Sequence, residues 1–328
     1  MNSLVSIIIP AYNSSKYLSE TLENVLSQTY DNFECLIIDD GSTDDTGAIA
    51  KSYVEKDSRM RYYYQENAGS AAARNTGLKF STGEFIQFLD ADDLIHPEKL
   101  KIQMNYLMMN QLVDIVFGQV IFFNKSGNVN FNSVIDYKNN LTKRVNGKNH
   151  DVLKYLIQDN IMPVHSALLR RKVVGVIGIF DVNLKSCEDY DFWFRAALSD
   201  CYFSYDNDPK STCYYRRHND NKSSSSSRLS YYRTLVIQKQ LDKINKNYHN
   251  IYSVLFNVFL LNHKKYLFGK NEKYFTDVVY TFDLALKHRS IRLLFINMQY
   301  LIMPNRIWNL LYWNGGLMQY LKIKIKNV

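Results

Sequence analysis

The sequence predicts an α/β fold with a doubly wound, mostly parallel sheet, followed by a helical C-terminal region. Over residues 4–123, short runs rich in Val and Ile alternate with segments whose apolar residues recur at helical spacing. Strands that alternate with helices are typical of a parallel sheet. From residue 229 onward only the helical pattern remains. We therefore predict two domains, residues 1–228 and residues 229–328.

The individual elements follow from local pattern. Pro10 ends the first apolar run because proline lacks the N–H that a central strand donates, and Thr43 or Asp44 is a suitable cap for a helix start. Strands are expected at residues 4–9, 33–38, 61–64, 84–89, 114–123, 165–170, 202–205 and 211–215. Helices are expected at residues 14–28, from 43 or 44 onward, and at 69–80, 96–111, 153–158 and 188–198.

Composition narrows the class of protein. The four cysteines show no Cys-x-x-Cys spacing, which indicates neither a metal site nor a disulfide framework and favours a reducing compartment. No run reaches the roughly 18 apolar residues that would span a bilayer, and no signal peptide is expected. Residues 229–328 carry 15 Lys and Arg against 4 Asp and Glu. Such a basic region predicts an anionic partner.

Carboxylates follow two of the predicted strands. Asp39 ends the second strand, and Asp90, Asp92 and Asp93 follow the fourth. The carboxyl ends of parallel strands are where an open α/β sheet binds ligands, and clustered hard oxygens suit Mg²⁺ or Mn²⁺. Taken alone, an Asp-x-Asp turn is more typical of a solvated acidic loop than of a metal site.

Five blocks in order carry a family resemblance over residues 4–223. They are residues 5–13 (VSIIIPAYN), 39–46 (DDGSTDDT), 67–77 (NAGSAAARNTG), 90–93 (DADD) and 188–195 (EDYDFWFR). The chain resembles glycosyltransferase family 2, an inverting family with the nucleotide-binding GT-A fold. The resemblance implies a metal-dependent enzyme with Mn²⁺ or Mg²⁺ as cofactor and a nucleotide sugar, expected to be a UDP sugar, as donor.

The resemblance also implies a role for each matching residue. Asp189 is the expected general base, and Asp92 and His218 are the expected metal ligands. The expected substrate- and nucleotide-binding residues are Pro10, Ala11, Tyr12, Asn13, Asp39, Asn67, Arg74, Asp90, Ala91, Asp93, Glu188 and Arg217. Structural alternatives stay open: packing for Tyr12, a surface ion pair for Arg74, helix capping for Asp189, and plain exposure for His218 and Arg217. His165 fits either a core position or the acceptor side.

The predicted function is transfer of one sugar to a hydroxyl of a glycan or lipid-linked acceptor in bacterial surface polysaccharide synthesis. The Gln-x-x-Arg-Trp sequence of processive synthases is absent after residue 189, which favours single transfer. A catalytically silent nucleotide-sugar-binding scaffold is the alternative. A nucleotidyltransferase is disfavoured, because residues 11–15 form no Gly-rich loop with a lysine.

The basic C-terminal region has two interpretations. Trp308, Trp313 and interspersed cations suit helices lying on an anionic membrane surface, which predicts a cytoplasmic protein bound peripherally to the inner face of the cell membrane. The alternative is a bundle that packs on the catalytic domain or forms a homo-oligomer. No nucleic-acid-binding motif accompanies the charge, so no nucleic-acid partner is expected.

Overall fold

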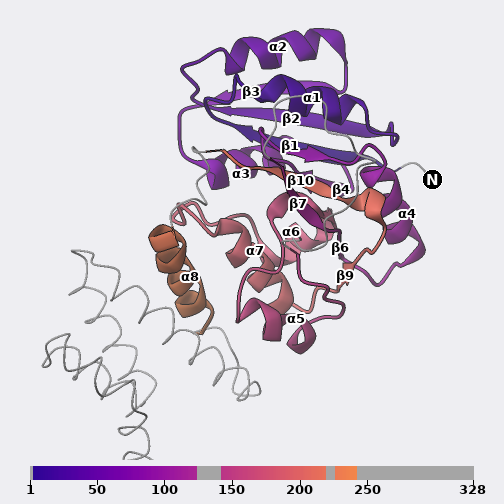
Figure 1. Ribbon diagram of the computed structural model, residues 1–328, viewed down its shortest axis with the longest axis vertical. Helices are drawn as coiled ribbons and strands as arrows, with labels where there is room; N and C mark the ends of the chain where they lie inside the picture. Colours follow the sequence, from indigo (N-terminus) through magenta and orange to yellow (C-terminus); the bar gives the residue numbers. More distant parts are fainter. Residues whose placement is uncertain (1–2, 124–141, 219–225, 242–328) are drawn as a thin grey trace, which may run out of the picture. The chain divides into compact units, whose positions relative to one another are not determined.

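The computed structural model describes residues 3–123, 142–218 and 226–241 (Figure 1). Its main sheet has seven strands in the order β3-β2-β1-β4-β8-β6-β9. These strands are β1 (Val5–Ala11), β2 (Phe33–Asp40), β3 (Met60–Gln65), β4 (Phe85–Phe88), β6 (Ile115–Phe117), β8 (Ala167–Arg170) and β9 (Phe203–Tyr205). The described helices are α1 (Leu18–Leu26), α2 (Thr46–Lys56), α3 (Ser70–Phe80), α4 (Lys99–Met109), α5 (His150–Leu156), α6 (Arg171–Ile177), α7 (Glu188–Leu198) and α8 (Ser226–Leu241).

Strand directions confirm the predicted doubly wound, mostly parallel sheet. Strands β1 to β4 run parallel to one another, and the register pairs Ala11 of β1 with Asp39 of β2. Strand β8 is antiparallel to β4 and β6, whereas β9 is parallel to β6. The carboxyl ends of β1, β2 and β4 therefore lie along one edge.

The core forms on both faces of this sheet because successive residues of β1 point in opposite directions. Ile7 and Ile9 belong to one buried cluster with Leu18, Leu22 and Val25, whose helical spacing places them on one side of α1. Ile8 points to the other face, where it meets Gly77 of α3. The apolar runs that predict strands are thus buried on both sides.

A second, three-stranded sheet departs from the sequence prediction. The single strand expected at 114–123 is two strands, β6 and β7 (Val120–Phe123), which belong to different sheets. The break falls at Gly118, where an added Cβ would lie 2.4 Å from the backbone oxygen of Ser211. Strand β7 pairs with β10 (Cys213–Arg216), which also pairs with β5 (Leu94–Ile95). This small sheet brings the end of β10 to the residues after β4.

Three further elements differ from the prediction. The start of the strand expected at 165–170 is a 3₁₀ turn, η2 (Val164–Ser166), and a second such turn, η3 (Pro209–Ser211), precedes β10. Helix α6 was missed, because its apolar residues are mainly β-branched and its sequence contains a glycine.

The C-terminal region is described only through α8. Val236 and Ile237 of this helix are buried, and Gln240 donates a hydrogen bond to Asp191 of α7 at 2.9 Å. The proposed boundary between residues 228 and 229 stays a prediction, and the predicted membrane-binding segments lie outside the described residues. Within 3–123, 142–218 and 226–241, no helix is long and apolar enough to cross a membrane.

We expect Gly77→Ala to destabilise the protein by about 1–3 kcal/mol, the usual cost of overpacking a core. The new Cβ would lie 2.3 Å from Cγ2 of Ile8, whose β-branched side chain cannot swing away. The matched control is Gly175→Ala in α6, where nothing lies within 4 Å of the new Cβ. The free energy of unfolding of this control variant should rise by about 0.5–1 kcal/mol, the usual advantage of alanine over glycine within a helix. The urea concentration at the unfolding midpoint, with the slope of the transition unchanged, measures the stability of each variant. Equal midpoints for Gly77→Ala and Gly175→Ala would contradict the close packing of α3.

Candidate active site

The sheet edge where β1 and β2 end presents a polar loop and a carboxylate. Tyr12 follows β1 and is 50% exposed, whereas Asp39 is 2% exposed. Asp39 accepts hydrogen bonds from the Ser42 backbone N–H at 2.9 Å and from the Tyr62 hydroxyl at 2.8 Å. Each carboxylate oxygen keeps a further lone pair. Pro10 and Ala11 are the last residues of β1, so they deliver this loop to the edge.

Asp40 holds the turn that leads into α3. Its carboxylate accepts hydrogen bonds from Gln65 and from the backbone N–H groups of Ala68 and Gly69. The Gly41–Ser42 turn is held by Asp39, which accepts the Ser42 N–H. Asp40 therefore fixes the entry to α3.

Two asparagines complete this edge. Asn13 has a φ of 47°, and its side-chain oxygen accepts the Thr43 backbone N–H at 2.9 Å. The backbone of Asn67 packs against Gly41, where an added Cβ would lie 2.8 Å from the Asn67 nitrogen. These contacts join the loops after β1, β2 and β3 into one surface.

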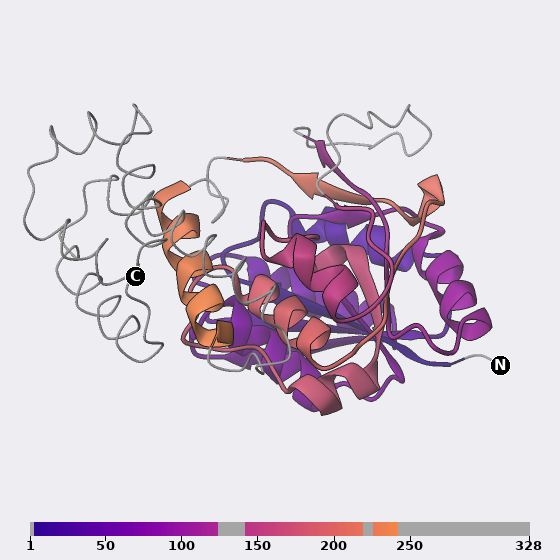
Figure 2. The ribbon, with the colours of Figure 1, turned by 90° about the horizontal axis from the view of Figure 1, so that it is seen from below.

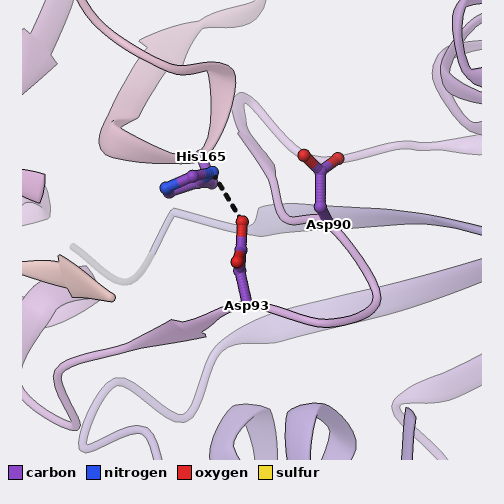
Figure 3. A group of neighbouring side chains, drawn as sticks. All are labelled: Asp90, Asp93 and His165. Carbon is purple, nitrogen blue, oxygen red and sulfur yellow. Dashed lines mark ion pairs between the residues drawn. The ribbon is translucent and has the colours of Figure 1, made fainter. Parts of the chain in front are cut away.

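The turn after β4 concentrates carboxylates. Donor atoms of Asp90, Asp93 and His165 all lie within 4.8 Å of one another. Figure 3 shows these three side chains and the ion pair between Asp93 and His165. Burial, together with the charges of Asp92 and Asp90, raises the pKa of Asp93 well above its usual range. Burial lowers the pKa of His165 to about 4, so its imidazole is neutral at physiological pH. His165, for which a core role and an acceptor-side role were both open, is fully buried beside this turn.

Asp92 contacts His218, the other metal ligand expected from the sequence. Oδ2 of Asp92 lies 2.7 Å from Nε2 of His218, although 126 residues separate them. Burial and the neighbouring charge of Asp90 raise the pKa of Asp92, and His218 opposes that rise. Ala91 between the aspartates is buried, and its carbonyl accepts a hydrogen bond from Thr21.

The residues of this turn fit a divalent cation. Carboxylate oxygens and neutral imidazoles are suitable donors, and three adjacent carboxylates repel one another unless positive charge is supplied. Both ring nitrogens of His165 are buried without a hydrogen-bond partner among the described residues, although Nδ1 lies 3.1 Å from Asp93. Two donor sets are therefore present, Asp92 with His218 and Asp90 with Asp93 and His165.

Arg216 shapes this acidic turn. Its backbone N–H donates to Asp93 at 2.8 Å, its Nε donates to the Asp92 carbonyl at 2.7 Å, and its Nη2 pairs with Glu20 at 2.7 Å. Arg217, the arginine expected to bind the nucleotide, is exposed, and its guanidinium carbon lies 3.3 Å from the ring centroid of Phe122. Arg216 is thus the arginine of this pair that contacts the acidic turn.

Arg74 joins this turn to helix α7. Its Nη2 lies 2.6 Å from Asp90, and its Nη1 lies 2.7 Å from Glu188. The arginine side chain is only 5% exposed, so this is a buried bridge and not a surface ion pair. Ser70 donates a further hydrogen bond to the same Glu188 oxygen at 2.9 Å. The helix that carries the expected base is therefore tied to the end of β4.

Asp189 lies at the start of α7 beside this bridge. Burial, with the charge of Glu188, raises the pKa of Asp189 to about 7, against the opposing effects of Arg74, the Tyr190 backbone N–H and Asn160. Asn160 Nδ2 donates to Oδ2 of Asp189 at 3.0 Å. Sequence analysis missed Asn160, because it lies after α5 in a segment outside all five blocks. A carboxylate with a pKa near 7 is suited to accept a proton.

The sheet, with its acidic turn and helix α7, has the GT-A fold. The chain belongs to glycosyl transferase family 2, whose family model matches residues 6–178. The family and fold expected from the sequence are confirmed.

Related proteins agree with this assignment. An uncharacterized glycosyltransferase of Rickettsia typhi is 35% identical over 206 residues, and the match covers 62% of each chain. An uncharacterized glycosyltransferase of Haemophilus influenzae is 36% identical over 195 residues, covering 58% of this chain and 70% of the relative. The chain thus spans about three fifths of the Rickettsia protein's length.

Two solved structures share the fold. Residues 1–349 of S. aureus TarS in complex with UDP-GlcNAc superpose with a TM-score of 0.64 at 24% identity, covering 85% of this chain and 80% of TarS 1–349. The mannosyltransferase PcManGT of Pyrobaculum calidifontis, in complex with GDP-Man and Mn²⁺, has a TM-score of 0.57 at 18% identity. That alignment covers 87% of this chain and 81% of PcManGT.

We expect Asn160→Ala to raise the pKa of Asp189 above about 7, because the lost hydrogen bond favours the charged carboxylate. The pKa is measured by ¹³C chemical-shift titration of labelled aspartate carboxyls, with Asp189→Asn to assign the signal. Asn110→Ala is the matched control, since that exposed side chain bonds only its own helix at Tyr106 among the described residues. An unchanged Asp189 midpoint in Asn160→Ala would contradict the contact.

Proposed function

We propose that the chain is an inverting, metal-dependent glycosyltransferase that moves one sugar from a UDP sugar to an acceptor hydroxyl. One observation carries the proposal: Arg74 ties Asp90, in the acidic turn, to Glu188, whose neighbour Asp189 has a pKa of about 7. The acidic turn, which would bind the metal and the diphosphate, is thereby held close to Asp189, which would accept the proton. Sugar transfer from a nucleotide requires both groups at one site.

The donor would bind along the edge formed by the loops after β1, β2 and β3. Asp39 retains lone pairs that can accept a pyrimidine N–H, and Tyr12 is exposed beside it. Pro10, Ala11, Asn13 and Asn67 shape the same edge. The TarS structure with UDP-GlcNAc, which has this fold, is consistent with a UDP sugar at that position.

Asp92 and His218 are the proposed ligands of Mn²⁺ or Mg²⁺, with Asp90 beside them. A bound divalent cation would neutralise the charge that develops on a diphosphate leaving group. Asp93 and Ala91 would lie close to the donor sugar, and the exposed Arg217 would reach the phosphates. PcManGT, which shares the fold, is a structure with Mn²⁺.

Asp189 would act on the acceptor. Its carboxylate would accept the proton of the attacking hydroxyl late in the reaction, because a carboxylate is a weak base toward an alcohol. Asn160 and the Tyr190 N–H hold the carboxylate in place. Attack from the face opposite the nucleotide would invert the anomeric centre, so an α-linked donor would give a β-glycoside.

The acceptor and location are proposed on broader grounds. A glycan or lipid-linked acceptor in bacterial surface polysaccharide synthesis is supported by the bacterial origin of the related sequences. Residues 229–328 would hold the enzyme at the inner face of the cell membrane, given their excess of 15 basic over 4 acidic side chains. Formation of a homo-oligomer is the alternative role for this region.

We expect the purified protein, with Mn²⁺ or Mg²⁺ present, to release UDP from one member of a panel of UDP sugars. EDTA should abolish this UDP release. Asp189→Asn should lower acceptor-stimulated turnover by about 10²–10⁴-fold, the usual contribution of a positioned base. Asp45→Asn, an exposed aspartate that begins α2, is the matched control. Binding of UDP with metal but no turnover of any donor would favour the silent-scaffold alternative, and no UDP binding would contradict the proposal.

Asp92→Asn should weaken Mn²⁺ binding in the presence of UDP by about 10–100-fold or more, since even groups outside the coordination sphere contribute that much to metal affinity. Calorimetry and Mn²⁺ paramagnetic resonance measure the affinity, with Asp45→Asn as the control. If His165→Gln loses the metal and Asp92→Asn keeps it, the ligands are Asp90, Asp93 and His165, and the assignment to Asp92 and His218 is wrong.

A further inference from the structure

A pocket of about 320 Å³ lies between three segments that are far apart in the sequence. Residues 68–71 bring the start of α3, residues 182–185 precede α7, and Tyr232 belongs to α8. None of the pocket residues is among the expected nucleotide or metal ligands. Ligand pockets commonly measure about 300–1,000 Å³, so this one is at the small end of the range and suits a monosaccharide unit.

The pocket adjoins the proposed reaction centre. Ser70, one of its lining residues, donates a hydrogen bond at 2.9 Å to Glu188, which precedes the proposed base. Lys185 and Leu184 lie in the segment that leads directly into α7. A group in this pocket would therefore lie next to the Ser70–Glu188 contact, one residue before the proposed base, whereas the Tyr12 and Asp39 edge belongs to the β1 and β2 loops.

Helix α8 is held firmly enough to be a wall of this pocket. Asp191 of α7, which is fully buried, accepts a hydrogen bond from Gln240 and pairs with Lys239 at 3.1 Å. Lys239 also pairs with Asp181 at 2.8 Å, next to the pocket residue Val182. Figure 2 shows α8, in orange, against the described domain. These contacts fix the helix on which Tyr232 stands.

A second contact links α8 to the base. Arg233, adjacent to Tyr232, pairs with Asp159. The residue after Asp159 is Asn160, which donates its hydrogen bond to Asp189. The helix therefore touches both the segment before α7 and the segment that orients the proposed base.

The lining matches the surface of a sugar ring. Val182, Leu184 and the Tyr232 ring offer apolar contact, while Ser70 and Lys185 offer polar groups at the edge. Lys185 is exposed and makes no ion pair or hydrogen bond with any residue that the structure describes. A pyranose has apolar C–H faces and a rim of hydroxyls, and tyrosine combines an apolar face with a polar end.

We propose that this pocket is the acceptor subsite and that it holds the acceptor's reacting sugar ring against Tyr232. Helix α8, at the start of the C-terminal region, is then a specificity-determining part of the active site. The inference rests on the proposed glycosyltransferase function and deepens it: the acceptor is a saccharide, and α8 contributes to its recognition.

The test uses the full chain with UDP and Mn²⁺, and methyl β-glycosides of glucose, galactose and N-acetylglucosamine as probes. Saturation-transfer NMR reports binding of the glycosides, and calorimetry reports UDP affinity in every variant to show that the donor site is intact. Val182→Trp fills the pocket. Ile179→Trp is the matched control, because Ile179 is an exposed aliphatic residue of the same segment that does not line the pocket.

At least one glycoside should bind the wild type, and Val182→Trp should weaken that binding by about tenfold or more, a loss equivalent to about 1.4 kcal/mol. Ile179→Trp should bind as the wild type does. Tyr232→Ala should weaken binding comparably, and Tyr232→Phe should retain most of it, because the ring provides the contact.

Three outcomes would overturn the inference. Equal glycoside binding in Val182→Trp and Ile179→Trp would place the acceptor elsewhere. Binding of no glycoside by a wild type that binds UDP would exclude a sugar ring as the occupant, and binding of a short-chain alkyl phosphate in its place would identify a lipid carrier. Failure of the wild type to bind UDP would instead overturn the proposed function itself, which separates the two results.

Discussion

The buried guanidinium of Arg74 joins the two halves of the site. It bridges Asp90 at the end of β4 and Glu188 at the start of α7, with contacts of 2.6 and 2.7 Å. Burying a charge is costly, but two carboxylate partners compensate for the cost and raise the pKa of Arg74 against the effect of burial. Removal of one partner from a buried pair commonly costs about 3–5 kcal/mol. The acidic turn and the base helix therefore cannot move independently.

This bridge accounts for only part of the negative charge. Burial and the charge of Asp90 raise the pKa values of Asp92 and Asp93, and the charge of Asp92 raises the pKa of Asp93 further. Arg216 supplies hydrogen bonds to this turn, and His218 contacts Asp92, but His165 is neutral and adds no positive charge. A protein that places three carboxylates in one partly buried turn sacrifices stability there, and a divalent cation is the partner that best offsets their repulsion.

Sequence alone predicted most of the strands and the family, because short-range pattern and family resemblance record these features. The resemblance also named Asp92 and His218 together as expected metal ligands; they lie in contact, and their metal-binding role stays a prediction. The sequence did not predict that the strand at 114–123 divides at Gly118, since the cause is the backbone of Ser211, more than ninety residues later. The sequence also did not predict the role of Asn160 or the hydrogen bonds from Arg216 to the acidic turn. Their roles depend on contacts that form only when distant segments fold together.

The family match covers only part of the proposed site. The match covers residues 6–178, which contain the β1 and β2 edge, Arg74 and the acidic turn, but neither Asp189 nor α8. The proposed donor-binding residues of the β1 and β2 edge and of the acidic turn lie within the matched segment, whereas Glu188, Arg217, His218 and the proposed base lie after it. Because α8 contacts Asp191 of α7 and Asp181 in the segment before α7, changes in α8 would act directly on the helix that carries the proposed base. Acceptor choice could then diverge between relatives while the donor chemistry of residues 6–178 stayed the same.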